Sequence, residues 1–193
     1  MRGTFLSVLA ATLWLAACDM PDGGLTAASS GSTPPPEKIA LAGGAVVVRG
    51  PEGYCIDPET SRSRNGQGVA VIASCFILSG GQTGYNVPPA IVTVTVGPKD
   101  PEGVVPDPAA LAKAAGAPLL GAYEQDGLAL AHLGGGGDKM LSEGDKRYWR
   151  GAFLQGGHMI GLALYAPEGD ALAGRDGARM LRQVRDLIVR ASP

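Results

Sequence analysis

The sequence predicts an α+β fold in which a short helix and a C-terminal amphipathic helix pack on a mostly antiparallel β-sheet. Residues 148–154 and 159–165 are strand-like runs around a Gly-Gly pair, which supplies the positive φ angles of a tight hairpin turn. Residues 91–96 alternate valine with threonine, as a half-exposed strand does. Residues 174–191 repeat apolar side chains at steps of three and four, which is typical of a helix with one buried face.

The first half of the folded region is expected to consist of short strands. Residues 45–48 are β-branched and precede turn residues at 50–53, so Tyr54-Cys55-Ile56 is expected to run back as the partner strand. Residues 59–68 are polar and predict an exposed loop. Residues 69–78 are apolar on both alternating sets, which predicts a strand that contains Cys75 and is covered on both faces.

The second half adds the predicted helices. Residues 80–89 are expected to form a loop, and the valines of 91–96 are expected to face inward. Asp107 followed by Pro108 predicts the start of a short helix that runs to Ala115. Residues 128–133 predict another short strand.

The C-terminal helix is expected to bury one stripe and expose its cations. The stripe consists of Leu181, Val184, Ile188 and Ala191, and the arginines expected in solvent are Arg175, Arg179, Arg182 and Arg185. The element order over residues 39–191 resembles the PsbP-like fold, an antiparallel sheet between an early short helix and a final long one. That resemblance implies an accessory or assembly role rather than one particular chemistry.

The N-terminus predicts where the protein resides. Arg2 precedes an apolar run that ends in Leu15-Ala16-Ala17-Cys18. This pattern resembles the lipobox of bacterial lipoproteins, which implies a cleaved signal peptide over 1–17 and acylation of Cys18. The alternatives are a signal without lipidation and an uncleaved membrane span, although a span needs about 20 apolar residues and this run is shorter.

The predicted anchor also suggests a domain layout and a membrane. Residues 18–38 are rich in Pro, Ser and Gly and predict a flexible tether behind the lipidated cysteine, with a single α+β domain over 39–193. The lipid bilayer is then one partner of the protein. By resemblance to Gram-negative lipoproteins, Asp19 directly after Cys18 implies retention at the periplasmic face of the inner membrane rather than the outer membrane.

The remaining cysteines, Cys55 and Cys75, form an even pair in a chain that is expected to be exported. Such a pair predicts a structural disulfide. Two free buried thiols and a redox role are the alternatives that the sequence leaves open. No C-x-x-C spacing supports the redox role.

The sequence offers no recognisable catalytic centre, metal site or cofactor motif. The run Gly134–Gly137 followed by Asp138-Lys139 lacks the spacing of a phosphate-binding loop. His132 and His158 are the only histidines, and His158 is expected in solvent at a hairpin tip. Glu124 and Asp126 lie beside Gly127 in a predicted turn, where acidic residues are ordinary. A net charge of −2 without a dense basic patch argues against nucleic acid as a partner.

These observations predict a membrane-anchored cell-envelope lipoprotein that acts as a non-enzymatic accessory, assembly or protein-interaction module. The main alternative is a periplasmic domain that binds a small ligand between sheet and helix, with residues 80–89 and 134–137 at the rim. A hydrolase is a third alternative. Arg62, Arg64 and the C-terminal arginines could also contact anionic lipid headgroups, although a solvated surface is the simpler interpretation.

Overall fold

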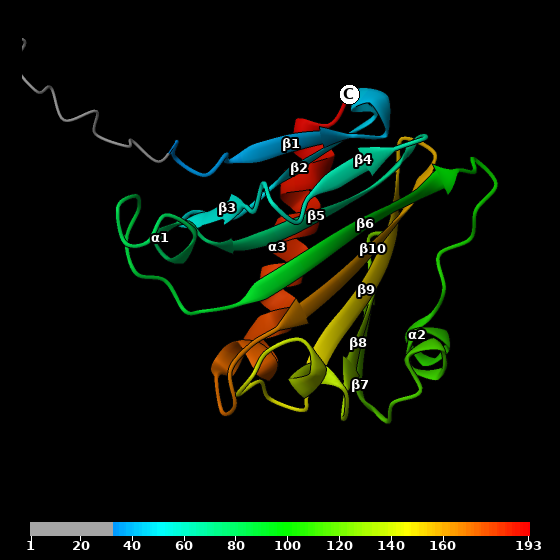
Figure 1. Ribbon diagram of the computed structural model, residues 1–193. Helices are drawn as coiled ribbons and strands as arrows, with labels where there is room; N and C mark the ends of the chain where they lie inside the picture. The colour runs from blue at the N-terminus through cyan, green and yellow to red at the C-terminus, as the bar shows by residue number, and fades with distance from the viewer. Residues whose placement is uncertain (1–32) are drawn as a thin grey trace, which may run out of the picture. The chain divides into compact units, whose positions relative to one another are not determined.

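The computed structural model describes residues 33–193, which belong to one compact unit (Figure 1). The predicted signal peptide, Cys18, Asp19 and most of the predicted tether lie outside the described residues. Within 33–193, no helix is long and apolar enough to cross a membrane.

An antiparallel sheet forms the centre of this unit. Its strands lie in the order β3 (Tyr54–Ile56), β5 (Gln67–Ser74), β6 (Ile91–Lys99), β10 (His158–Tyr165), β9 (Tyr148–Gln155), β8 (Leu128–Leu133) and β7 (Leu119–Gln125), and β4 (Arg62–Arg64) also pairs with β5. A separate ribbon joins β1 (Lys38–Leu41) to β2 (Val46–Arg49). The helices are α1 (Cys75–Leu78), α2 (Pro108–Ala115) and α3 (Arg175–Ala191), with short 3-10 turns at Ala42–Gly44, Gly137–Lys139 and Ala171–Ala173. The predicted α+β class is confirmed.

The β9–β10 hairpin has the predicted Gly-Gly turn, because Gly156 and Gly157 both adopt positive φ and Gln155 pairs with His158. His158 is therefore the first strand residue rather than a solvated turn residue, and the expectation of exposure is wrong. Its side chain is buried, and its Nδ1–H donates to the Gly97 carbonyl at 2.9 Å. The imidazole thus ties β10 to the bulged end of β6.

The predicted pairing of residues 45–48 with Tyr54-Cys55-Ile56 is wrong. Strand β2 pairs with β1 instead, and β3 pairs with β5, with Tyr54 opposite Ser74. Both runs are short and apolar, so local sequence does not distinguish the two partners. Packing decides between them, because Val46 and Val48 are completely buried in the cluster that includes α3.

The predicted strand 69–78 ends early. Strand β5 stops at Ser74, and Cys75 begins the helical turn α1, whose first turn is capped by the Ser74 hydroxyl accepting from the Ile77 N–H at 3.4 Å. Only one face of β5 is fully covered, since Ala70 and Ile72 are buried while Val69 is 38% exposed. Residues 69–78 are apolar at both alternating sets of positions because the run combines a strand with a helical turn.

Besides β1, two strands were not expected. The polar segment 59–68 contains β4, which folds back on β5 through a turn at Asn65-Gly66. Strand β7 pairs with β8 across Asp126-Gly127, but its sequence LLGAYEQ lacks alternation and most of its residues are exposed. The strand over Leu128–Leu133 and the helix capped by Asp107 are confirmed, the cap accepting from the Ala110 N–H at 2.7 Å.

Helix α3 packs on the face of the sheet that carries the main core. Leu181, Val184 and Ile188 are completely buried as predicted, whereas Ala191 is exposed. Both ends of α3 are attached to the rest of the fold by hydrogen bonds. The Trp149 indole N–H donates to the Gly174 carbonyl at 2.7 Å, and Ser192 Oγ accepts from the Val47 N–H at 2.9 Å.

The arginines of α3 do not all extend into solvent. Arg175 and Arg179 have exposed side chains, but only 13% of the Arg185 side chain is accessible and Arg182 is half-buried. Both turn toward the β7–β8 hairpin, which was not foreseen because β7 itself was not predicted.

The opposite face of the sheet is covered only in part. Helix α2 packs there, with Ala112 in a small cluster with Ala131, Leu133 and Tyr148. This cluster lies over β8 and β9. Thr95 and Val69 on the same sheet are exposed, so the part of this face near β5 and β6 stays open.

The close contact between α3 and Trp149 yields a stability prediction. Replacing Gly177 with alanine raises helix propensity but places a Cβ against the Leu172 carbonyl and the Trp149 ring. We expect Gly177→Ala to lower the free energy of unfolding by about 1–3 kcal/mol, measured by chemical denaturation. Gln183→Ala, at an exposed position of the same helix, is the control and should change it little. Equal stability of Gly177→Ala and the wild type would contradict this packing.

Candidate functional site

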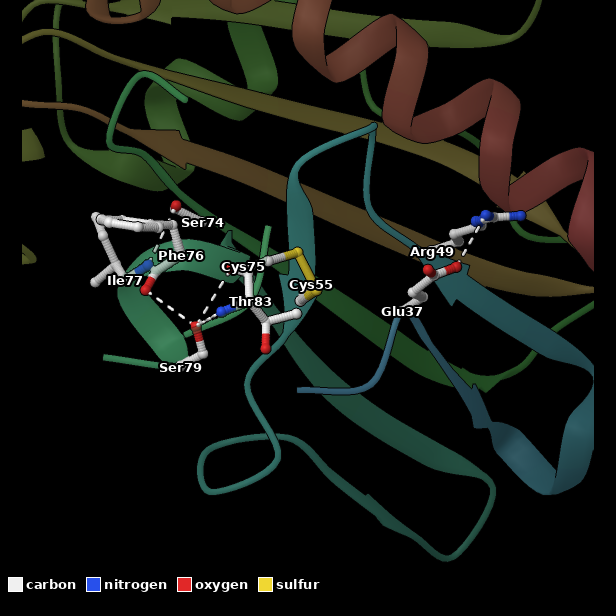
Figure 2. Close-up of a disulfide and its surroundings, with 9 residues drawn as sticks. All are labelled: Glu37, Arg49, Cys55, Ser74, Cys75, Phe76, Ile77, Ser79 and Thr83. Carbon is white, nitrogen blue, oxygen red and sulfur yellow. Dashed lines mark hydrogen bonds and ion pairs between the residues drawn. A yellow bond between two sulfur atoms is a disulfide. The ribbon is translucent and has the colours of Figure 1, made fainter. Parts of the chain in front are cut away.

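The predicted disulfide is present. Cys55 in β3 and Cys75 at the start of α1 are joined, with their Cα atoms 4.9 Å apart (Figure 2). Both residues are buried, and the Cys75 N–H donates to the Gly53 carbonyl at 2.9 Å. The bond therefore links an edge strand to the segment that leaves β5, which is a structural role.

The surroundings of the bond are held by polar contacts as well. The Ser79 hydroxyl, at the end of α1, accepts from the Thr83 N–H at 2.8 Å and donates to the Phe76 carbonyl at 3.2 Å (Figure 2). Burial raises the pKa of Tyr54 to about 12, and its hydroxyl donates to the Pro88 carbonyl at 2.7 Å. The loop over residues 80–89 is thus fastened at both ends.

The chain enters the fold beside this disulfide. The Ile56 N–H donates to the Pro36 carbonyl at 2.7 Å, and Glu37 forms an ion pair with Arg49 at 3.1 Å (Figure 2). The C-terminal end of the predicted tether is therefore already attached to β3 and β2.

The two histidines both have structural partners and lie apart in the sheet. His132 stacks on Trp149 with ring centroids 4.5 Å apart, and its Nε2–H donates to the Ala173 carbonyl at 2.9 Å. His158 lies at the far end of β10, bound to Gly97. Within residues 33–193, no group of three or more His, Cys, Asp or Glu side chains could hold a metal ion.

Sequence reasoning missed a buried carboxylate. Asp145 is almost fully buried and accepts from the Arg147 guanidinium at 2.6 Å, the Arg147 backbone N–H at 2.8 Å and the Gly169 N–H at 3.2 Å. Hydrogen bonding from the guanidinium holds the pKa of this carboxyl well below its usual range. Asp145 thereby joins the β8–β9 connection to the loop before α3. Its short-range pairing with Arg147 gave no recognisable motif.

A groove lies on the open face of the sheet. It has a volume of about 800 Å³, and strand β4 with Arg62 and Arg64 forms its wall. Its floor comes from β5, β6 and β10, where Val69, Thr95 and Gly161 lie side by side. A Cβ on Gly161 would be 2.5 Å from the Thr95 hydroxyl, so any other residue there would force the Thr95 side chain to move.

The groove combines an apolar floor with a cationic wall. Val69 and Met159 contribute apolar surface, and the Arg62 and Arg64 side chains are exposed. Within the described part of the chain, neither arginine forms an ion pair or hydrogen bond through its side chain. This arrangement can bind a chain that offers apolar side chains and a few acceptors.

The loops over residues 80–89 and 134–137, which were expected to form the rim of one cleft, lie apart in the structure. They follow β5 and β8, and strands β6, β10 and β9 lie between these two in the sheet. Glu124 and Asp126 lie at the β7–β8 hairpin, and the Asp126 carbonyl accepts from Arg185 at 2.7 Å.

The comparisons with protein-family models, curated proteins and solved structures gave no significant match. The resemblances to lipoproteins and to the PsbP-like fold therefore remain predictions from the sequence.

The disulfide makes a measurable contribution to stability. It spans a sequence separation of 20 residues, and in the chain-entropy model a loop of about this length corresponds to roughly 3 kcal/mol. We expect the double variant Cys55→Ser/Cys75→Ser to lose a free energy of unfolding of about that size. Thermal unfolding of the wild type with and without reductant checks the same effect. Identical melting in both conditions would contradict it.

Acid stability should depend on Asp145. Because its pKa is lower in the folded than in the unfolded chain, where it is about 3.9, its interactions stabilise the fold above about pH 4, and this contribution declines as the pH falls further. We expect Asp145→Asn to be less stable at neutral pH and to show a shallower loss of stability on acidification. The control is Asp138→Asn, at an exposed position. Parallel acid profiles for Asp145→Asn and wild type would exclude this role.

Proposed function

We propose that this protein is a membrane-anchored lipoprotein of the cell envelope whose folded domain binds another envelope protein without catalysing a reaction. The Leu15–Cys18 lipobox pattern supports export and acylation. The Cys55–Cys75 disulfide supports an oxidising compartment, because such bonds persist outside the cytoplasm.

The groove on the open sheet face is the observation that carries the binding proposal. Small-molecule sites enclose most of their ligand, whereas this groove lies open along three strands. A polypeptide segment can use its length, with apolar contacts to Val69 and Met159 and hydrogen bonds to Arg62 and Arg64. The geometry thus favours a protein partner over the small ligand considered as an alternative.

The tether sets how far this domain reaches from the membrane. Residues 18–35 lie between the proposed anchor and the first residue attached to β3. At about 3 Å per residue, the rise of an extended chain, they would span at most roughly 50 Å. With Asp19 favouring the inner membrane, the domain would meet partners within that distance of its periplasmic face.

The anchor can be tested directly. We expect intact-mass analysis of the mature protein to show a chain that starts at Cys18 and carries acyl groups, and Cys18→Ala to move from the membrane to the soluble fraction. Two or more acyl chains are needed for durable attachment, since one gives only marginal binding. A Cys18→Ala protein that stays membrane-bound would overturn the anchor.

The docking groove can be tested by site-specific crosslinking in intact envelopes. A photo-reactive amino acid in place of Arg64 should give a discrete crosslinked product, since that side chain lines the groove. The control position is Lys113, which is exposed on α2, and should give little. Val69→Glu, which puts a charge on the apolar floor, should abolish the product. Equal crosslinking from both positions would contradict docking in the groove.

A further inference from the structure

A second surface lies between strand β7 and helix α3, on the face of the sheet that α3 covers. It is a groove of about 430 Å³ with an excess of positive charge. Its four arginines are accompanied by only two aspartates, and the residues concerned are Arg179, Arg182, Arg185, Arg190, Asp126 and Asp186.

The charges in this groove are only partly neutralised from within the chain. Arg185 forms an ion pair with Asp186 at 2.6 Å, and Arg179 forms one with Asp176 at 3.0 Å. Arg182 lies over the Tyr123 ring, 5.0 Å from its centroid, and its buried Nε has no hydrogen-bond partner in residues 33–193. Arg190 has no ion pair within the same range. The guanidinium groups of Arg182 and Arg190 therefore have no carboxylate partner in the described residues, and acceptors from a binding partner could form charge-assisted hydrogen bonds with them.

The strand beside this groove has a free edge. Strand β7 pairs with β8 on one side and is the last strand of the sheet. Because Gln125 and Leu128 flank the two-residue turn, the ladder alternation directs the backbone groups of Ala122 and Glu124 outward. No described residue forms a backbone hydrogen bond to these groups. Natural sheets usually cover or charge such an edge, and exposed edges accept strands.

We propose that β7 binds an extended acidic segment of a partner protein as an added strand, with its acidic side chains on the arginines of α3. This deepens the proposed function and rests on it, because it names the chemistry of a protein partner. An added strand would lie about 4.8 Å from β7 with side chains alternating between the two faces. Every second residue would then face Arg182 and its neighbours, so acids at alternate positions fit best.

Two other occupants fit the charges less well. A second copy of this chain paired through β7 would bring two sets of α3 arginines together across the symmetry axis, where like charges repel. An anionic lipid surface could neutralise the arginines but would leave the hydrogen-bonding edge of β7 unused. An extended acidic polypeptide satisfies both the edge and the cations.

The test measures fluorescence anisotropy with the full-length mature protein in neutral detergent. The probe is a short labelled peptide in which glutamate and valine alternate, and the comparison peptide has lysine in place of glutamate. We expect saturable binding of the glutamate peptide and roughly tenfold weaker binding of the lysine peptide. Arg182→Gln and Ala122→Pro should each weaken binding about tenfold, the first through charge and the second through the strand edge.

Arg175→Gln is the matched control, since Arg175 is exposed on the same helix outside the groove, and it should bind as the wild type does. Arg190→Gln provides a second charge variant if proline at 122 prevents folding. Equal binding of the two peptides, or unchanged binding in Arg182→Gln, would overturn the inference. So would Arg182-dependent binding to phosphatidylglycerol vesicles without peptide binding. Crosslinking from position 64 does not involve β7. If that crosslink forms while the peptide fails to bind, only the inference about β7 has failed and the proposed function stands.

Discussion

The packing of α3 against one face of the sheet is the interaction on which the rest of the structure depends. Leu181, Val184 and Ile188 are completely buried in the cluster that also contains Phe153 and Ile160. Fully burying a side chain of this size contributes roughly 1.5–3 kcal/mol relative to exposure. The helix lacks a side-chain N-cap, and its position is fixed instead by Trp149 and His132 at the beginning and by Ser192 at the end.

Several peripheral features follow from this packing. The β1–β2 ribbon has no strand partner in the main sheet, and it is held because Val46 and Val48 share the core with α3. The same helix carries Arg182 and Arg185 to the β7–β8 hairpin, where they meet Tyr123 and Asp126. With one face of the sheet covered by α3, only α2 covers the other, and the groove beside Arg62 and Arg64 remains.

Local patterns predicted the elements whose structure is decided locally. The Gly156-Gly157 turn, the Asp107 cap and the buried stripe of α3 each depend on neighbouring residues, and all are present except that Ala191 of the stripe is exposed. The errors have a different origin. Strand β2 pairs with the adjacent β1 because Val46 and Val48 are buried beside α3, and the edge position of β7 depends on the strand order of the whole sheet. The helical turn at Cys75 has a local cap in Ser74, but the apolar run around it resembles a strand. The Cys55–Cys75 bond was predictable because pairing the only cysteines left besides Cys18 requires no knowledge of the fold.

The candidate surfaces were less predictable than the fold. Arg62 and Arg64 were recognised as exposed cations. Their place on the groove wall depends on strand β4, which was not predicted because its sequence is polar. Asp145 was missed because its partners combine a near neighbour, Arg147, with the distant Gly169. The contacts of such charged groups can be inferred only when the strands that position them are known.

Amide hydrogen exchange of the full-length protein tests this account most directly. The account predicts that the amides of α3 and of the central strands β6, β10 and β9 exchange only through global unfolding, with similar protection. It also predicts rapid exchange at Ala122 and Glu124, whose N–H groups face outward from the free edge of β7. Rapid exchange throughout α3, or strong protection at those two edge amides in the isolated protein, would contradict it.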